Sequence, residues 1–106
     1  MLAQEWLRQN GFVLLHHNWR HSRYEIDIVA SRDSLLHFIE VKTRRSTRFG
    51  EPEESVHRHK LRYLLKAGAA YQYEHPQWKR VQYDVLSITL VKDEKPEYFF
   101  IEDVYL

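Results

Sequence analysis

Residues 24–42, YEIDIVASRDSLLHFIEVK, decide the fold because they predict two β-strands that pair through a tight polar turn. Side chains alternate between the two faces of a strand, so Glu25 lies on the same face as Asp27. For the same reason, Glu40 and Lys42 share a face of the second strand. Symmetric pairing about the turn places Asp27 opposite Glu40. It also places Glu25 opposite Lys42.

The predicted pair of Asp27 and Glu40 points to a bound cation. Like charges directly across a sheet are destabilising, so two carboxylates in this position are expected to hold a positive ion between them. The alternative is a cross-strand network of salt bridges on a solvated sheet face, where each exposed pair contributes about 0–1 kcal/mol. That alternative explains Glu25 opposite Lys42, but it gives no reason for Asp27 opposite Glu40.

The whole chain predicts a single α/β domain over residues 1–106, with a mixed β-sheet flanked by helices. The expected order is helix, three strands, helix and two strands, and the strand after the second helix is expected to run parallel to an earlier one. The expected elements are a helix that stops at Asn10-Gly11, strands at about 12–19, 24–30 and 35–42, a helix at about 53–74, and strands at about 81–88 and 98–101.

Composition excludes several classes of protein. The chain has no cysteine, which rules out disulfides and thiolate zinc sites. No apolar run approaches the ~20 residues needed to cross a bilayer, and the first residues lack the pattern of a signal peptide. We therefore expect a cytoplasmic protein without a membrane partner.

Positive charge is concentrated directly after the carboxylates, although the net charge of the chain is only +1. Residues 42–48, KTRRSTR, contain four basic residues and no acidic one. Arg44, Arg45 and Arg48 suit contacts with DNA phosphates, a mode of binding that is independent of sequence and sensitive to salt. A solvated loop is the alternative for a run this short.

The residue types fit metal-dependent hydrolysis of a phosphodiester. Mg²⁺ or Mn²⁺ prefers oxygen ligands, which Asp27, Glu40 and the backbone carbonyl of Val41 could supply. Such an ion polarises a phosphoryl oxygen and lowers the pKa of a bound water. Lys42 would orient that water or stabilise charge developing on phosphorus. Glu25 would steady Lys42, bind a second ion or act through water.

Lys60 interrupts the apolar stripe of the second predicted helix. A lysine in that position either extends along the helix to reach solvent or points at an anionic group near the sheet. A carboxylate and phosphate site on the same sheet favours the second outcome.

An ordered series of short motifs extends over roughly residues 1–90. It comprises Ala3-x-x-Trp6-Leu7-x-x-x-Gly11, Asn18-Trp-Arg20, Glu25-Ile-Asp27-Ile-Val-Ala30, Phe38-Ile-Glu40-Val-Lys42-x-Arg44, Phe49-Gly50-x-Pro52, Lys60, Ala67-x-Ala69-Ala70-Tyr71 and Tyr83-Asp84-Val85. This series resembles the YraN-like family of predicted endonucleases, which belongs to the PD-(D/E)xK nuclease superfamily and is related to archaeal Holliday junction resolvases.

The resemblance implies a restriction-endonuclease-like core, with Asp27 and Glu40 as metal ligands and Lys42 as the catalytic lysine. It also implies that Glu25 and Lys60 are accessory catalytic residues.

The chain departs from the family pattern in two places. The family usually has Gly-Glu shortly before the alanine matched by Ala3, and the sequence starts too late to include that glutamate. The family also prefers glycine where this chain has Tyr24, whose ring could narrow access to the site or stack on a base.

We therefore expect a Mg²⁺- or Mn²⁺-dependent endonuclease that acts on DNA, including branched or otherwise structured DNA. The alternative, favoured by the missing glutamate, is a catalytically impaired nuclease fold that binds nucleic acid or a protein partner. A third hypothesis is a structural or interaction domain whose apolar strand, Glu97–Ile101, pairs with another chain. In either of the first two cases the same strand could be the edge of a homodimer.

Overall fold

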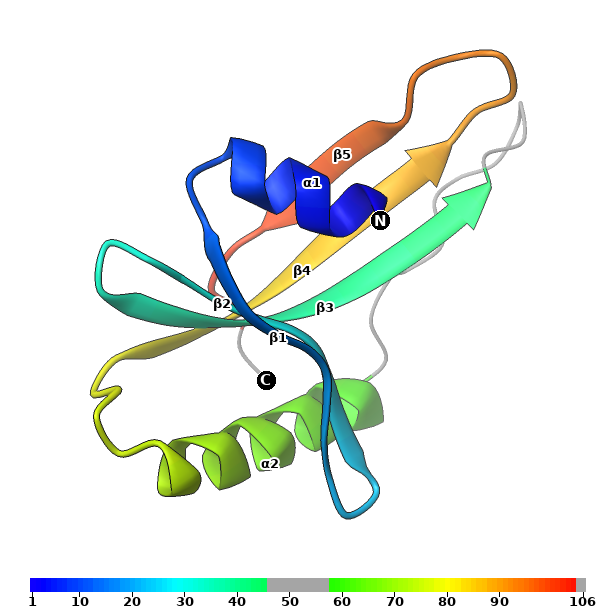
Figure 1. Ribbon diagram of the computed structural model, residues 1–106. Coiled ribbons are helices and arrows are strands. Elements are labelled where there is room, and N and C mark those ends of the chain that lie inside the picture. Colours follow the sequence, from blue (N-terminus) through cyan, green and yellow to red (C-terminus); the bar gives the residue numbers. More distant parts are fainter. Residues whose placement is uncertain (46–57, 105–106) are drawn as a thin grey trace.

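The computed structural model describes residues 1–45 and 58–104, which form two helices and five strands (Figure 1). The elements are α1 (Leu2–Gln9), β1 (Val13–His21), β2 (Tyr24–Arg32), β3 (Leu35–Arg45), α2 (Arg58–Glu74), β4 (Val81–Leu90) and β5 (Glu97–Ile101). This order confirms the prediction. Strands β1 to β4 extend two or three residues beyond their predicted carboxyl ends, because backbone pairing continues where the apolar pattern has already stopped. Residues 53–57 of the predicted second helix lie outside the described residues.

The five strands form one mixed sheet in the order β1-β2-β3-β4-β5. All neighbours are antiparallel except β3 and β4, which are parallel and connected through α2, as predicted. Asp33 and Ser34 alone form the turn between β2 and β3, with left-handed φ values of 54° and 66°. Positive φ at both positions matches the right-handed twist of the flanking strands, so this turn fixes the register.

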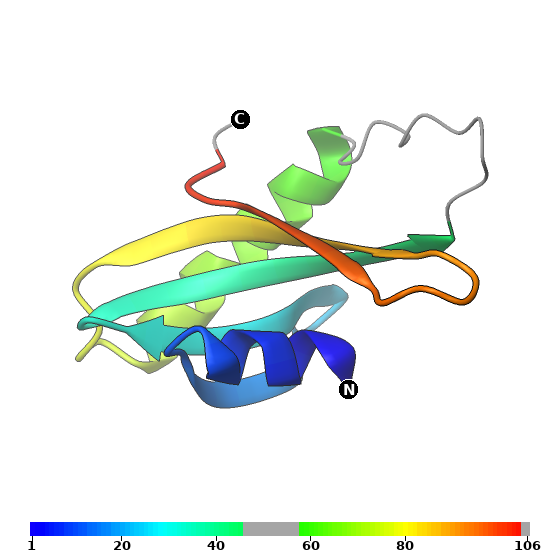
Figure 2. The same ribbon diagram turned by 90° about the horizontal axis from the view of Figure 1, so that it is seen from above.

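The two helices cover opposite faces of the sheet (Figures 1 and 2). Leu7 of α1 packs with Ile28, Ile39 and Leu86 of the sheet. On the other face, Leu64, Ala67 and Tyr71 of α2 pack against side chains that include Phe38 and Val29. Burial on this second face raises the pKa of Tyr71 and Tyr83 above the ordinary value of 10.0. The sheet is therefore sandwiched between two separate apolar layers.

Gly68 allows α2 to approach the sheet closely. A Cβ atom at this position would lie 2.5 Å from the hydroxyl oxygen of Tyr83 and 2.9 Å from Cδ2 of Phe38. These distances are shorter than van der Waals contact, so a larger residue would push the helix or the two rings away. The neighbouring helix residues Tyr63 and Leu64 line the candidate site described below, so this close approach also positions the site.

The hairpin of β1 and β2 bends at Asn18 and Asp27. Asn18 has a left-handed φ of 52° and lies between the paired residues His17–Ile28 and Trp19–Ile26, level with Asp27. Beyond this point the hairpin curls towards α2 (Figure 1). As a result, Ile28 belongs to the α1 layer whereas Ile26 belongs to the α2 layer, although regular alternation would place both on one face.

A buried polar pair joins the two central strands. His37 of β3 and Asp84 of β4 are 1% and 0% exposed, and His37 Nδ1 lies 2.6 Å from Asp84 Oδ2. The other oxygen of Asp84 accepts hydrogen bonds from the Gln82 side chain and from the backbone N–H of Asp103, both at 2.9 Å. Asp84 therefore fixes the chain that follows β5 against the sheet.

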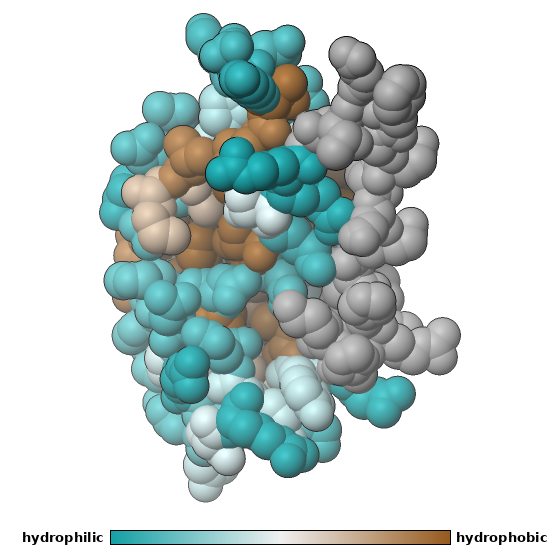
Figure 3. All heavy atoms as spheres, turned by 90° about the vertical axis from the view of Figure 1, so that its right-hand side faces the viewer, coloured by the Kyte–Doolittle hydropathy of each residue, from teal (hydrophilic) through white to brown (hydrophobic). Residues whose placement is uncertain are grey.

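Neither helix, over the residues that the structure describes, is long and apolar enough to span a membrane. Figure 3 shows apolar side chains gathered between hydrophilic ones in the upper and central part of one face of the molecule. On the edge strand β5, Phe99 is 65% exposed and Ile101 is 36% exposed. A homodimer through this strand stays a prediction.

Candidate functional site

Three predicted carboxylates line one cavity on the α2 side of the sheet. The cavity has a volume of about 180 Å³, and its lining residues are Arg23, Glu25, Asp27, Glu40, Tyr63 and Leu64. The pairs from Ile28–Ile39 to Arg32–Leu35 have the predicted register, in which Asp27 is level with Glu40. The structure therefore brings Asp27 and Glu40 to the same cavity, as the sequence predicted.

Backbone pairing between β2 and β3 stops just before this site. The last paired residues are Ile28 and Ile39, so the two outer pairs expected from symmetric extension, Asp27–Glu40 and Glu25–Lys42, are not formed. In their place, Asp27 Oδ2 accepts a hydrogen bond from the backbone N–H of Val41 at 2.8 Å. The bend of the hairpin turns β2 away from β3 at this point, and a side chain bridges the gap.

Glu25 has a different partner from the one predicted. It pairs with Arg20 across the β1–β2 hairpin, and its Oε1 lies 3.7 Å from Arg20 Nη2. Both side chains are well exposed, so the ion pair contributes little to stability. The expectation that Glu25 lies opposite Lys42 is wrong, because β2 has already left β3 at this position.

The predicted basic residues on β3 do not line the cavity. Lys42 shares a strand face with Glu40 but pairs with Ser87 of β4 and does not line the cavity. Arg44 and Arg45 end the same strand, and Arg45 is exposed. Arg48 lies outside the described residues. The backbone of Lys60 lies in the first turn of α2, but its side chain is outside the description.

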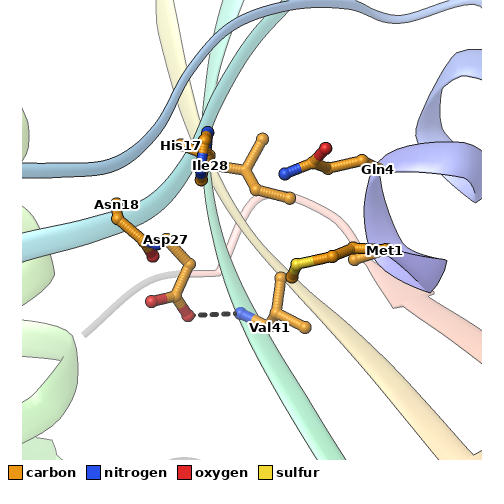
Figure 4. Close-up of a pocket in the computed structure, with 8 residues that line it drawn as sticks. Met1, Gln4, His17, Asn18, Asp27, Ile28 and Val41 are labelled. Atoms are coloured by element: carbon orange, nitrogen blue, oxygen red, sulfur yellow. Dashed lines mark hydrogen bonds between the residues drawn. The ribbon is translucent and has the colours of Figure 1, made fainter.

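A second cavity reaches Asp27 from the α1 side of the sheet. It has a volume of about 230 Å³ and is lined by residues of α1, β1, β2 and β3, namely Met1, Ala3, Gln4, His17, Asn18, Asp27, Ile28 and Val41. Figure 4 shows the Asp27 carboxylate at one end of this space, with Met1 and Gln4 of the α1 end at the other. Asp27 therefore lies at the bend between two cavities, one on each face of the sheet.

The oxygen atoms around Asp27 fit a hard divalent cation. Within a strand, the N–H and C=O of one residue point to the same side, so the carbonyl of Val41 lies on the side of Asp27. Asp27 and Glu40 add carboxylate oxygens at the same cavity. Mg²⁺ commonly takes one or two carboxylates and keeps several waters. Over residues 1–45 and 58–104, the structure contains no group of three or more His, Asp or Glu side chains that could hold a metal ion.

The sequence reasoning missed two residues of the cavity, Arg23 and Tyr63. Arg23 lies in the two-residue connection between β1 and β2, and the polar pair Ser22-Arg23 between two alternating runs was a usable signal for this hairpin tip. Tyr63 had no such signal, because it lies beside the buried stripe of α2 and reaches the cavity through the packing of the helix on the sheet.

The sequence is similar to one protein-family model and to proteins of several organisms. The sequence model of Uncharacterised protein family UPF0102 matches residues 1–88. A UPF0102 protein of Syntrophomonas wolfei is 46% identical over 96 residues, covering 89% of this chain and 82% of the relative. UPF0102 proteins of Dictyoglomus thermophilum and Rhodococcus opacus are 39% and 34% identical, covering 86% and 98% of this chain and 78% and 89% of those relatives.

Proposed function

The chain belongs to Uncharacterised protein family UPF0102, and from its acid-lined cavity we propose that it is a metal-dependent endonuclease that hydrolyses phosphodiester bonds in DNA. The observation that carries the proposal is the meeting of Asp27 and Glu40 at one cavity, beside a strand that continues into Lys42, Arg44 and Arg45. The order of helices and strands is also that expected of a restriction-endonuclease-like core.

Each residue of the candidate metal site has an assigned role in this proposal. Asp27, Glu40 and the carbonyl of Val41 hold Mg²⁺ or Mn²⁺, which when bound polarises the phosphoryl oxygen and activates water. The Val41 N–H fixes the Asp27 carboxylate in place before substrate arrives. Lys42 lies on the same face as Glu40, where its ammonium group stabilises the negative charge that develops on the phosphate.

Other residues support this centre, either by binding the substrate or as accessory catalytic residues. Arg44 and Arg45 follow on the same strand and contact phosphates that flank the cleaved bond. Lys60 is an accessory residue on the first turn of α2, and Arg48 extends the basic run. Glu25 tunes the charge of the cavity, with Arg20 as its partner.

Cleavage of labelled DNA tests this function directly. Single-stranded, duplex, flap and four-way substrates are incubated with Mg²⁺, Mn²⁺ or EDTA. Wild-type protein is expected to cut at least one substrate in the presence of metal, and Lys42→Ala is expected to lower the rate by at least about 100-fold while DNA affinity changes little. Lys92→Ala, a change at an exposed lysine far along the chain, is the matched control.

The results separate the two main hypotheses. Cutting by Lys42→Ala at the wild-type rate would contradict the assigned role of that lysine. Salt-dependent binding without cutting on any substrate would favour a nuclease fold that only binds nucleic acid.

A further inference from the structure

We propose that Arg23, held against two tyrosine rings at the tip of the β1–β2 hairpin, binds a phosphate of the DNA strand next to the cleaved phosphodiester. This inference rests on the proposed function and adds a second, separate contact with the substrate. It assigns a role to the hairpin tip, which contributes none of the predicted metal ligands or basic residues.

The hairpin places Arg23 at the mouth of the acidic cavity. His21 and Tyr24 form the last pair of the hairpin. Ser22 and Arg23 form the two-residue turn between them, and Ser22 has a left-handed φ of 58°. The hairpin bends towards α2, so its tip lies beside the site. Arg23 therefore lines the same cavity as Asp27 and Glu40.

Two aromatic rings hold the guanidinium group in position. Arg23 Cζ lies 5.5 Å from the ring centroid of Tyr24 and 5.8 Å from that of Tyr63. The rings contact each other edge to face, with 5.4 Å between centroids. Contacts of this kind stabilise a cation over an aromatic face and reduce the number of orientations that the side chain can adopt. The group is therefore oriented before a ligand binds.

The hydrogen-bonding capacity of Arg23 remains largely unused. Over residues 1–45 and 58–104, no carboxylate lies within 4.0 Å of its guanidinium group, whereas the nearby Arg20 forms a salt bridge with Glu25. The guanidinium group lies over the faces of the Tyr24 and Tyr63 rings, and these contacts leave its N–H donors available to a ligand. A planar guanidinium with free donors matches the paired oxygens of a phosphate.

The negative charge of the cavity determines whether Arg23 binds free phosphate or a backbone phosphate of DNA. An isolated anion would be repelled by Glu25, Asp27 and Glu40, so Arg23 alone is a poor site for inorganic phosphate. A nucleic-acid strand held elsewhere by Arg44 and Arg45 carries a neighbouring phosphate to Arg23 at little further entropic cost. The ligand is therefore a backbone phosphate of bound DNA, not free phosphate.

Salt-dependent DNA binding tests this inference. We measure DNA affinity with fluorescent DNA for wild type, Arg23→Gln, Arg23→Lys and Arg80→Gln. The salt concentration is varied between 50 and 200 mM, a range over which the loss of phosphate contacts changes affinity strongly. Ca²⁺ replaces Mg²⁺ to prevent cutting. One lost phosphate contact lowers the slope of log K against log salt by about 0.9. We expect that loss in Arg23→Gln and a preserved slope in Arg23→Lys. The control Arg80→Gln, a change at an exposed residue directly before β4, should keep the full slope.

Single methylphosphonate substitutions identify the phosphate that is bound. Each removes the charge of one phosphate near the cleavage position. Replacement of the contacted phosphate should weaken binding by wild type but not by Arg23→Gln, because that variant has already lost the contact. Thermal unfolding confirms that the variants are folded, and free phosphate at millimolar concentration should not compete.

Three outcomes are decisive. An unchanged salt slope in Arg23→Gln, together with weaker binding by Arg44→Gln and Arg45→Gln, would overturn only the role of Arg23. Competition by free phosphate would overturn the assignment to a DNA backbone. If wild-type protein binds no DNA under any of these conditions, the proposed function falls together with this inference.

Discussion

Replacing Asp27 by Asn or by Ala separates the two roles that the structure gives to this residue. The carboxylate fixes the neighbouring strand through its hydrogen bond with the Val41 N–H, and it is a proposed metal ligand. Asn keeps an oxygen that can accept the bond but loses the charge. Ala removes both. The two variants therefore differ in stability and resemble each other in activity.

The hydrogen bond sets the expected loss of stability. It is 2.8 Å long and partly buried at the point where pairing between β2 and β3 stops, so no neighbouring strand can replace the acceptor. Leaving the N–H without a partner costs about 1–3 kcal/mol, so we expect Asp27→Ala to lose about 2 kcal/mol. Asp27→Asn should remain within about 1 kcal/mol of wild type, because a weaker bond is offset by reduced repulsion from Glu25 and Glu40.

Urea unfolding and DNA cleavage measure the two effects independently. Both variants should lose metal-dependent cutting by at least about 100-fold, since a neutral side chain is a poor ligand for Mg²⁺. Rapid cutting by the stable Asp27→Asn variant would refute the metal role. Asp27→Ala with wild-type stability would refute the structural role of the hydrogen bond.

Two further predictions concern the packing that supports the site. Gly68→Ala should destabilise by up to about 2 kcal/mol, because overpacking against Tyr83 costs about 1–3 kcal/mol and a gain in helix propensity offsets about 1 kcal/mol of it. Ala69→Gly, an exposed change on the same helix, measures that propensity. A Gly68→Ala variant more stable than wild type would contradict the close approach. Asp84→Ala should lower the free energy of unfolding measured in urea by about 1–3 kcal/mol, because it leaves the buried His37 side chain without its hydrogen-bond partner. A loss below about 1 kcal/mol would show that the pair is not needed for stability.

Several features of the site follow from local patterns in the sequence. Alternating apolar residues predicted the strands, and the polar turn between them predicted the register that brings Asp27 level with Glu40. Asn10-Gly11 predicted the end of α1, where Gly11 has a left-handed φ of 89°. These signals are short in range, because each depends on residues that are neighbours in the chain.

The sequence by itself determined which elements form, their order and the pair of acids at the centre of the site. Only the tertiary structure decided where pairing stops, that Glu25 contacts Arg20, and that Arg23 and Tyr63 join the cavity. The bend at Asn18 and the close approach of α2 at Gly68 produce these contacts. Both depend on packing between residues far apart in the chain, which a local pattern of polar and apolar residues does not encode.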